Sequence, residues 1–64
     1  MKRKDLIQRL RKNGCVFIRE GAKHSVFFNP SINKLSTVPR HTDIDNFLAK
    51  KICRDLGIES TGIK

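Results

Sequence analysis

Several features that would mark a secreted, metal-binding or membrane protein are scarce in this 64-residue chain. It has no tryptophan or tyrosine, and its two cysteines, Cys15 and Cys53, lack the spacing of metal ligands. No apolar run approaches the roughly 18 residues that span a bilayer, and no signal-like segment follows the charged residues 1–4. We therefore expect a cytoplasmic protein without metal or cofactor. Its cysteines are expected to be reduced core residues, with a disulfide or reactive thiol as the alternative.

Acidic residues are also few. The chain has 14 lysines and arginines against 6 aspartates and glutamates, which gives a net charge of +8. Such a balance favours a partner rich in phosphate or carboxylate groups, RNA among them. Its length predicts one domain, residues 1–64, in which folding buries only about 60% of the unfolded surface. A protein partner, or a homodimer in or out of that complex, would add stability.

Apolar periodicity predicts two helices and three strands. Leu6, Ile7 and Leu10 form one helical stripe that ends at Gly14, and Gly57 ends the second helix. The predicted elements are a helix over 2–13, strands over 15–20, 24–29 and 34–38, a helix beginning near 42–45, and a loose tail over 58–64. In the second strand, His24, Val26 and Phe28 point one way, whereas Ser25, Phe27 and Asn29 point the other.

The order α-β-β-β-α predicts an α+β fold in which two helices cover one face of a three-stranded antiparallel sheet, like the double-stranded-RNA-binding domain. The opposite sheet face stays open. The second helix presents a stripe that includes Ile44, Phe47 and Leu48. The predicted core consists of Leu6, Leu10, Phe17 or Ile18, Val26 or Phe27, Ile44, Leu48 and Ile52.

The segment Gly21-Ala22-Lys23-His24 is the main candidate for a functional site. Histidine exchanges protons near neutral pH, and a strand end beside a glycine turn can expose its imidazole to a ligand. A general base needs such a group, and Lys23 beside it can stabilise negative charge. A surface histidine without a role is the competing interpretation, which the residues alone favour.

Other candidates are less specific. His41 could act as a general acid, but a loop residue that helps to cap the following helix is the better interpretation. Asp43 and Asp45 lie where a helix begins, which suits acids without any metal. The predicted phosphate contacts are Lys23, Arg40, Lys50, Lys51 and Arg54, although most such charges form a solvated helix face.

The chain resembles the HicA-type toxins of bacterial toxin–antitoxin systems, the YcfA family of mRNA interferases, from Lys4 to Ile58. The resemblance is carried by Asn13-Gly14-Cys15, Arg19-Glu20-Gly21-Ala22-Lys23-His24-Ser25, Asn29-Pro30, Val38-Pro39-Arg40-His41, Ile52-Cys53 and Leu56-Gly57-Ile58. Many members place Gly-Ser immediately before the histidine, where this chain has Ala22-Lys23.

The resemblance implies that His24 is the catalytic residue of a metal-independent endoribonuclease, neutralised by a HicB-type antitoxin. With this resemblance, a catalytic His24 is favoured over a surface histidine without a role. Two alternatives remain: a non-catalytic RNA-binding module of the same fold, and an adaptor that binds DNA or the ribosome.

Overall fold

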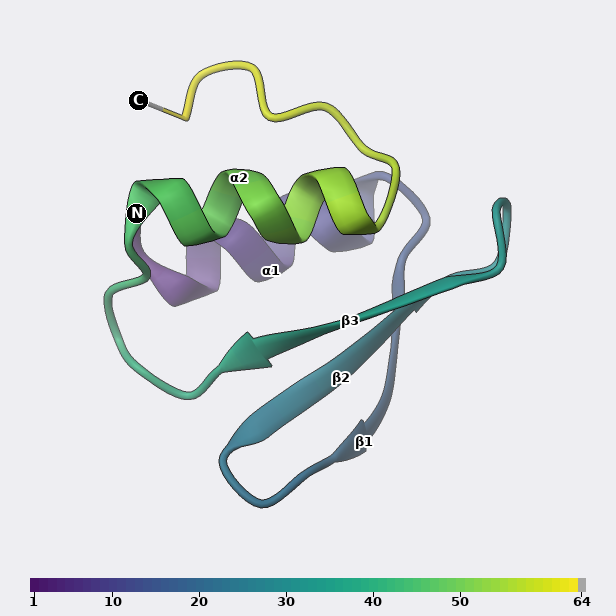
Figure 1. Ribbon diagram of the computed structural model, residues 1–64, viewed down its shortest axis with the longest axis horizontal. Coiled ribbons are helices and arrows are strands. Elements are labelled where there is room, and N and C mark those ends of the chain that lie inside the picture. Colours follow the sequence, from purple (N-terminus) through teal and green to yellow (C-terminus); the bar gives the residue numbers. More distant parts are fainter. Residues whose placement is uncertain (64) are drawn as a thin grey trace.

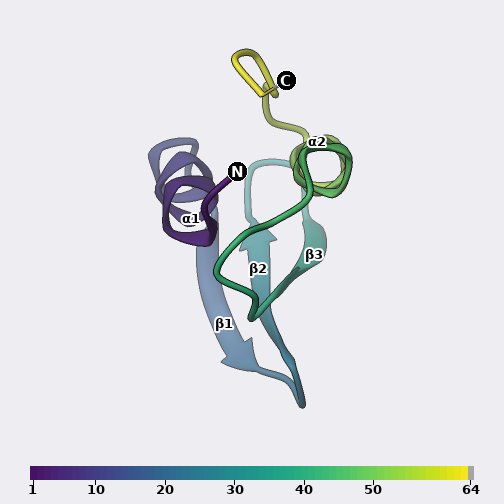
Figure 2. The ribbon, with the colours of Figure 1, turned by 90° about the vertical axis from the view of Figure 1, so that its left-hand side faces the viewer.

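The computed structural model describes residues 1–63 and has the predicted order α-β-β-β-α. The elements are α1 (Arg3–Lys12), β1 (Val16–Glu20), β2 (His24–Asn29), β3 (Lys34–Pro39) and α2 (Asn46–Asp55). The strands form one antiparallel sheet in the order β1-β2-β3, and both helices lie on the same face of it (Figures 1 and 2). The predicted α+β architecture is therefore confirmed. Within residues 1–63, no helix has the length and apolarity needed to cross a bilayer.

The core lies between the sheet and the two helices. Phe27 on the central strand is 1% exposed, and Leu6, Leu10, Ile44 and Ile52 are also buried, as predicted. The other buried apolar residues are Cys15, Val38, Ala49, Cys53 and Leu56. Leu48 is only partly buried and packs against this cluster from its edge.

The apolar position predicted for Phe47 is wrong. Phe47 is 74% exposed, because α2 begins at Asn46 and its buried stripe is Ala49, Ile52, Cys53 and Leu56. At about 100° per residue, Phe47 lies on the opposite side of that helix. Ile44 precedes the helix and is buried from a loop, so its spacing to Phe47 was not a helical repeat.

The first strand is the second correction. Phe17 and Ile18, one of which was expected in the core, are 48% and 47% exposed. β1 is an edge strand, and its register shifts between Phe17 and Arg19. Such a bulge gives the strand one extra residue and reverses the side-chain alternation beyond it. Phe17 therefore shares the helix-facing side with Phe27, whereas Arg19 pairs with Val26 on the open side.

Both cysteines are buried free thiols. Burial raises the pKa of Cys15 and of Cys53, and the neighbouring Cys53 raises the pKa of Cys15 further. Thiols of this kind stay protonated at neutral pH and are poor nucleophiles. The two residues therefore act as small apolar groups in the core, as predicted from the sequence.

The two ends of the sheet are anchored differently. At the end distant from His24, buried Asn29 donates from Nδ2 to the carbonyl oxygen of Leu56 at 2.7 Å. At the His24 end, the first residues of the chain pair with the loop that precedes α2. The Arg3 amide donates to the Thr42 carbonyl at 2.8 Å, and the Ile44 amide donates to the Met1 carbonyl at 2.7 Å. The first contact fixes the end of α2 to the sheet, and the second pair fixes the start of α1 to the loop before α2.

The segment predicted as a loose tail lies back over the helices as far as Ile63 (Figure 1). Ile58 and Ile63 pack against the core, and the Glu59 carbonyl accepts a hydrogen bond from Arg9. Lys64, the last residue of the predicted tail, lies outside the described residues.

Substitutions on the two sides of α2 should separate the core from the surface. Ile52→Ala removes a side chain that is 2% exposed, so it should lower the free energy of unfolding by roughly 2–5 kcal/mol. Phe47→Ala should change it by less than about 0.5 kcal/mol, because Phe47 faces solvent. Urea denaturation of both variants measures the difference, and equal losses would contradict the observed orientation of the helix.

Candidate active site

His24 is an exposed side chain at the first position of β2, directly after the turn Gly21-Ala22-Lys23. The Gly21 amide donates to the His24 carbonyl at 2.7 Å and closes this turn. A Cβ atom at Gly21 would lie 3.3 Å from that oxygen, which is tighter than an ordinary contact. The glycine therefore permits the close turn that ends at His24, and the imidazole itself remains accessible to a ligand.

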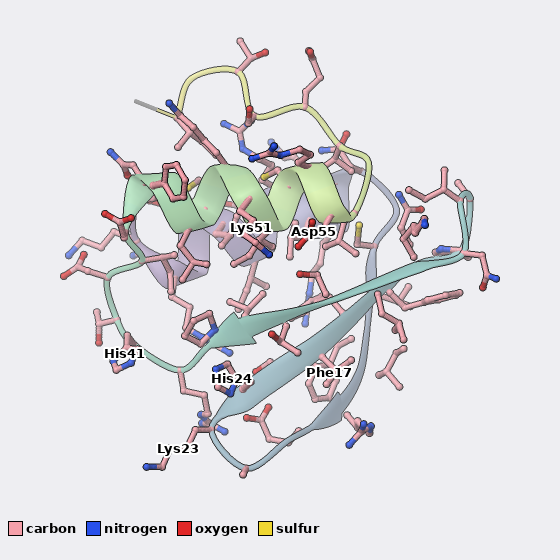
Figure 3. All side chains as sticks on the ribbon, in the orientation of Figure 1. Phe17, Lys23, His24, His41, Lys51 and Asp55 are labelled. Carbon is pink, nitrogen blue, oxygen red and sulfur yellow. The ribbon has the colours of Figure 1, made fainter. Side chains whose placement is uncertain are left out.

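Strand pairing brings further candidates to this end of the sheet. His24 pairs with Pro39, so Arg40 and His41 follow immediately beyond the partner of His24. Figure 3 shows Lys23, His24 and His41 at the same end of the molecule. Sequence analysis gave no reason to place His41 near His24, because that proximity depends on the register of β2 and β3. The structure thus supplies the geometric link that the sequence lacked.

A polar network centred on buried Ser25 supports this end of β2, and sequence analysis did not anticipate it. The Arg3 guanidinium donates from Nε to the Pro39 carbonyl at 2.9 Å and from Nη2 to the Ser25 hydroxyl at 2.6 Å. Ser25, which is 2% exposed, donates in turn to a carboxylate oxygen of Glu20 at 2.9 Å. The other Glu20 oxygen accepts from Arg40. The network joins α1 to all three strands.

The bulge in β1 makes this network possible. Regular alternation from Phe17 would place Glu20 on the open face, whereas the shifted register pairs Glu20 with Ser25 on the helix-facing side. The hydrogen bond from Ser25, followed by the bond from Arg40, lowers the pKa of the Glu20 carboxyl below its ordinary value. Glu20 is therefore ionised at neutral pH and orients Arg40.

The predicted phosphate contacts on α2 do not gather around His24. Lys51 forms an ion pair with Asp55 at 3.1 Å, and Lys50 is half-buried. Arg54 is exposed near the C-terminal end of α2, which Leu56 and Asn29 tie to the distant end of β2. The structure brings together Lys23, His24, Arg40 and His41, and leaves the three cations of α2 on a separate surface.

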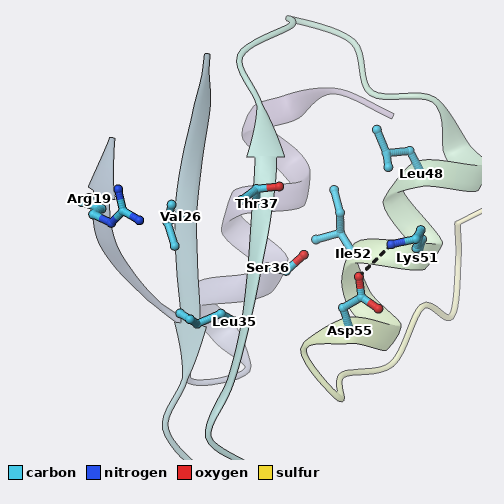
Figure 4. A pocket seen from close by; sticks show the side chains of 9 residues that line it. All are labelled: Arg19, Val26, Leu35, Ser36, Thr37, Leu48, Lys51, Ile52 and Asp55. Atoms are coloured by element: carbon cyan, nitrogen blue, oxygen red, sulfur yellow. Dashed lines mark hydrogen bonds and ion pairs between the residues drawn. The ribbon is translucent and has the colours of Figure 1, made fainter. Parts of the chain in front are cut away.

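A groove with a volume of about 410 Å³ lies between β3 and α2 (Figure 4). Arg19 and Val26 line it from the sheet, and Lys51 and Asp55 line it from the helix. His24 is not among its lining residues. We place the candidate active site at His24 and not in this groove. The only carboxylate that lines the groove, Asp55, is paired with Lys51, and the groove has no histidine that could transfer a proton.

Metal ligands do not cluster in the part of the chain that the structure describes. Across residues 1–63, no three side chains of histidine, cysteine, aspartate or glutamate come together as a metal site would require. Asp43 faces Lys2 at 3.9 Å, and the Asp45 carboxylate accepts from the Leu48 amide at the start of α2. Both acids therefore have structural roles at the helix start.

These features define a small, strongly basic α+β protein with an exposed histidine among cationic groups. Comparison with known families identifies it further. Residues 3–58 match the model of the HicA toxin of bacterial toxin–antitoxin systems, and the chain belongs to this family. Comparisons with curated proteins and with solved structures gave no match.

The pKa of Glu20 predicts how acid affects the fold. A carboxyl whose pKa is lowered by folding stabilises the protein above its unfolded value, here about 4.5, and this contribution disappears as pH falls through the folded-state value. Glu20→Gln should therefore lose less stability than the wild type when pH is lowered below 4.5. Urea midpoints across this range provide the measurement.

The matched control is Glu59→Gln, because the Glu59 side chain is exposed and makes no hydrogen bond or ion pair within residues 1–63. It should follow the wild-type curve. A Glu20→Gln curve parallel to that of the control would show that the network does not depend on the charge of Glu20.

Proposed function

We propose that this member of the HicA toxin family is a metal-independent endoribonuclease that uses His24 as its general base. The observation that carries the proposal is the position of His24, exposed at the start of β2 with Lys23 beside it and Arg40 one residue beyond its strand partner. Membership of a toxin family and the net charge of +8 add support for RNA as the substrate.

RNA carries its own nucleophile, so the protein needs few groups. His24 accepts the proton of a ribose 2′-hydroxyl, whose oxygen attacks the adjacent phosphorus and displaces the 5′-oxygen of the next nucleotide. Lys23 and Arg40 stabilise the negative charge that builds on the phosphate oxygens. The products are a 2′,3′-cyclic phosphate and a 5′-hydroxyl end, and no redox partner or metal takes part.

The leaving 5′-oxygen needs a proton, and His41 is the candidate donor. It lies two residues beyond Pro39, the strand partner of His24, in the exposed loop before α2. Its alternative role is that of a loop residue without chemistry. The two roles predict different dependences of the cleavage rate on pH. With His41 as general acid the rate has a maximum and falls on both sides of it, whereas without a general acid the rate falls only toward low pH.

Neutralisation by an acidic HicB-type antitoxin is part of the same proposal. The basic surface favours an acidic partner, because opposite charges speed encounter and like charges reject wrong partners. An antitoxin that covers exposed His24 would block the base directly. This mode of inhibition requires no change in the fold of the toxin.

His24→Ala should reduce RNA cleavage by about 10²–10⁴-fold, the usual effect of losing a general base. The fold should persist, because His24 is exposed and contributes nothing to the core. Cleavage by the wild type should decline in acid, since a protonated imidazole cannot accept a proton, and a chelator should leave the rate unchanged. A labelled single-stranded RNA and end-group analysis of the products measure these effects.

Thermal unfolding of His24→Ala provides the control for its fold. Wild-type cleavage rates in a folded His24→Ala protein would remove this histidine from catalysis. An RNA that binds to the wild type but is never cut would favour the non-catalytic RNA-binding module instead.

The cations of α2 should differ in their contribution to RNA binding. Affinity for a single strand should fall with salt with a slope of about −0.7 for each phosphate neutralised. Arg54→Gln should reduce this slope more than Lys51→Gln, because Asp55 already pairs with Lys51 at 3.1 Å. Titrations at several salt concentrations measure the slopes. An equal reduction of the slope by both substitutions would show that RNA displaces the Lys51–Asp55 ion pair.

A further inference from the structure

A second groove lies on the helix-facing side of the sheet, between α1 and β1, with a volume of about 260 Å³. We call it the arginine groove, because Arg3, Arg11 and Arg40 line it together with Phe17, Glu20 and Ser25. Its volume is below the ~300–1,000 Å³ of pockets for drug-sized ligands. A single planar group with an attached charge therefore suits it better than an extended ligand.

The charges of the arginine groove are unbalanced. Three arginines and one glutamate line it, so its lining carries a net charge of +2. Arg3 uses two of its five N–H donors for Pro39 and Ser25, and the Arg11 side chain makes no hydrogen bond or ion pair with any residue of 1–63. These free donors favour an anion, and the planar guanidinium fits phosphate oxygens in particular.

An aromatic side chain stands at the same groove. Phe17 is 48% exposed on the edge strand, a position that gives it little value as a core residue. Its ring meets the buried ring of Phe27 edge to face, with centroids 5.8 Å apart. This contact fixes the orientation of Phe17 while much of its surface stays open. A fixed, exposed ring beside arginines is the combination on which proteins stack an unpaired base.

The arginine groove adjoins the candidate active site through the backbone. Ser25, which lines the groove, directly follows His24, and Arg40 directly follows the strand partner of His24. Phe17 pairs with Phe27, which is three residues along β2 from His24. His24 itself points to the open side of the sheet, whereas the groove lies on the helix-facing side, so an RNA strand bound at both sites passes around the end of the sheet where β2 begins.

We propose that the arginine groove is a nucleotide subsite that holds an unpaired base of single-stranded RNA while a neighbouring part of the same strand lies at His24, around the end of the sheet. Phe17 stacks on the base, while Arg3 and Arg11 hold the flanking phosphates. Glu20 keeps Arg40 at the rim, between the subsite and His24. The subsite rests on the proposed function for its substrate class but not on cleavage itself.

The chain has no tryptophan or tyrosine, so one substitution can report on the subsite. Phe17→Trp introduces a single fluorophore, and His24→Ala in the same protein prevents cleavage during the titration. A short single-stranded oligoribonucleotide of mixed sequence should quench its fluorescence to saturation. The matched control is Phe47→Trp in the same background, at a position 74% exposed on α2, where no quenching is expected.

Two further measurements sharpen the test. Phe17→Leu should weaken binding of the oligoribonucleotide by about 5- to 100-fold, the range that one stacking side chain contributes, whereas Phe47→Leu should not. Arg11→Gln should reduce the salt slope by about 0.7, and Lys34→Gln, at the far end of the β2–β3 hairpin, should not. A perfect duplex should quench poorly, because its bases are already stacked.

The outcomes separate the subsite from the proposed enzyme. RNA binding without quenching at position 17, no RNA binding at all, or equal quenching by a duplex would overturn the subsite. Saturable quenching in a protein whose wild type never cuts RNA would support the subsite and reject the ribonuclease. Thermal unfolding of the Phe17 variants confirms that each has folded before its binding is compared.

Discussion

The candidate site depends on the hydrogen bonds that the Arg3 guanidinium donates to two strands. This guanidinium extends from the first turn of α1 to the Pro39 carbonyl on β3 and the Ser25 hydroxyl on β2. A single side chain thus fixes the helix to the two strands whose ends carry His24 and Arg40. Hydrogen bonds that involve a charged group are stronger than neutral ones, and burial strengthens them further. Loss of this contact would leave the Ser25 hydroxyl with Glu20 alone.

The fold was largely predictable because its signals are local. Glycines end both helices, and alternation along β2 correctly assigned Ser25, Phe27 and Asn29 to the buried side. Errors arose where the apolar residues did not follow one regular element. Ile44 is buried from a loop, which shifted the apparent stripe of α2 onto exposed Phe47. An edge strand with a bulge defeated the prediction for Phe17 and Ile18.

The site was predictable only in part, for a different reason. His24, Lys23 and Arg40 stood out by residue type and by resemblance to a family. The contacts of Arg3, Ser25 and Glu20 did not, because they depend on strand register and on one inserted residue. A bulge leaves little trace in a sequence, and here it decides which face carries Glu20. Glu20 in turn reduces repulsion among arginines without cancelling their charge.

Synthesis of the chain leaves the candidate site incomplete until late, because the segments that hold it come from distant parts of the sequence. Arg3 and Pro39 are 36 residues apart, and residues 1–3 pair with residues 42–44. A nascent chain that contains His24 and Ser25 but not β3 lacks both the strand partner of His24 and the Pro39 carbonyl, one of the two acceptors for Arg3. If the protein cuts RNA as proposed, the ribosome that makes it therefore meets no assembled toxin until most of the polypeptide has emerged.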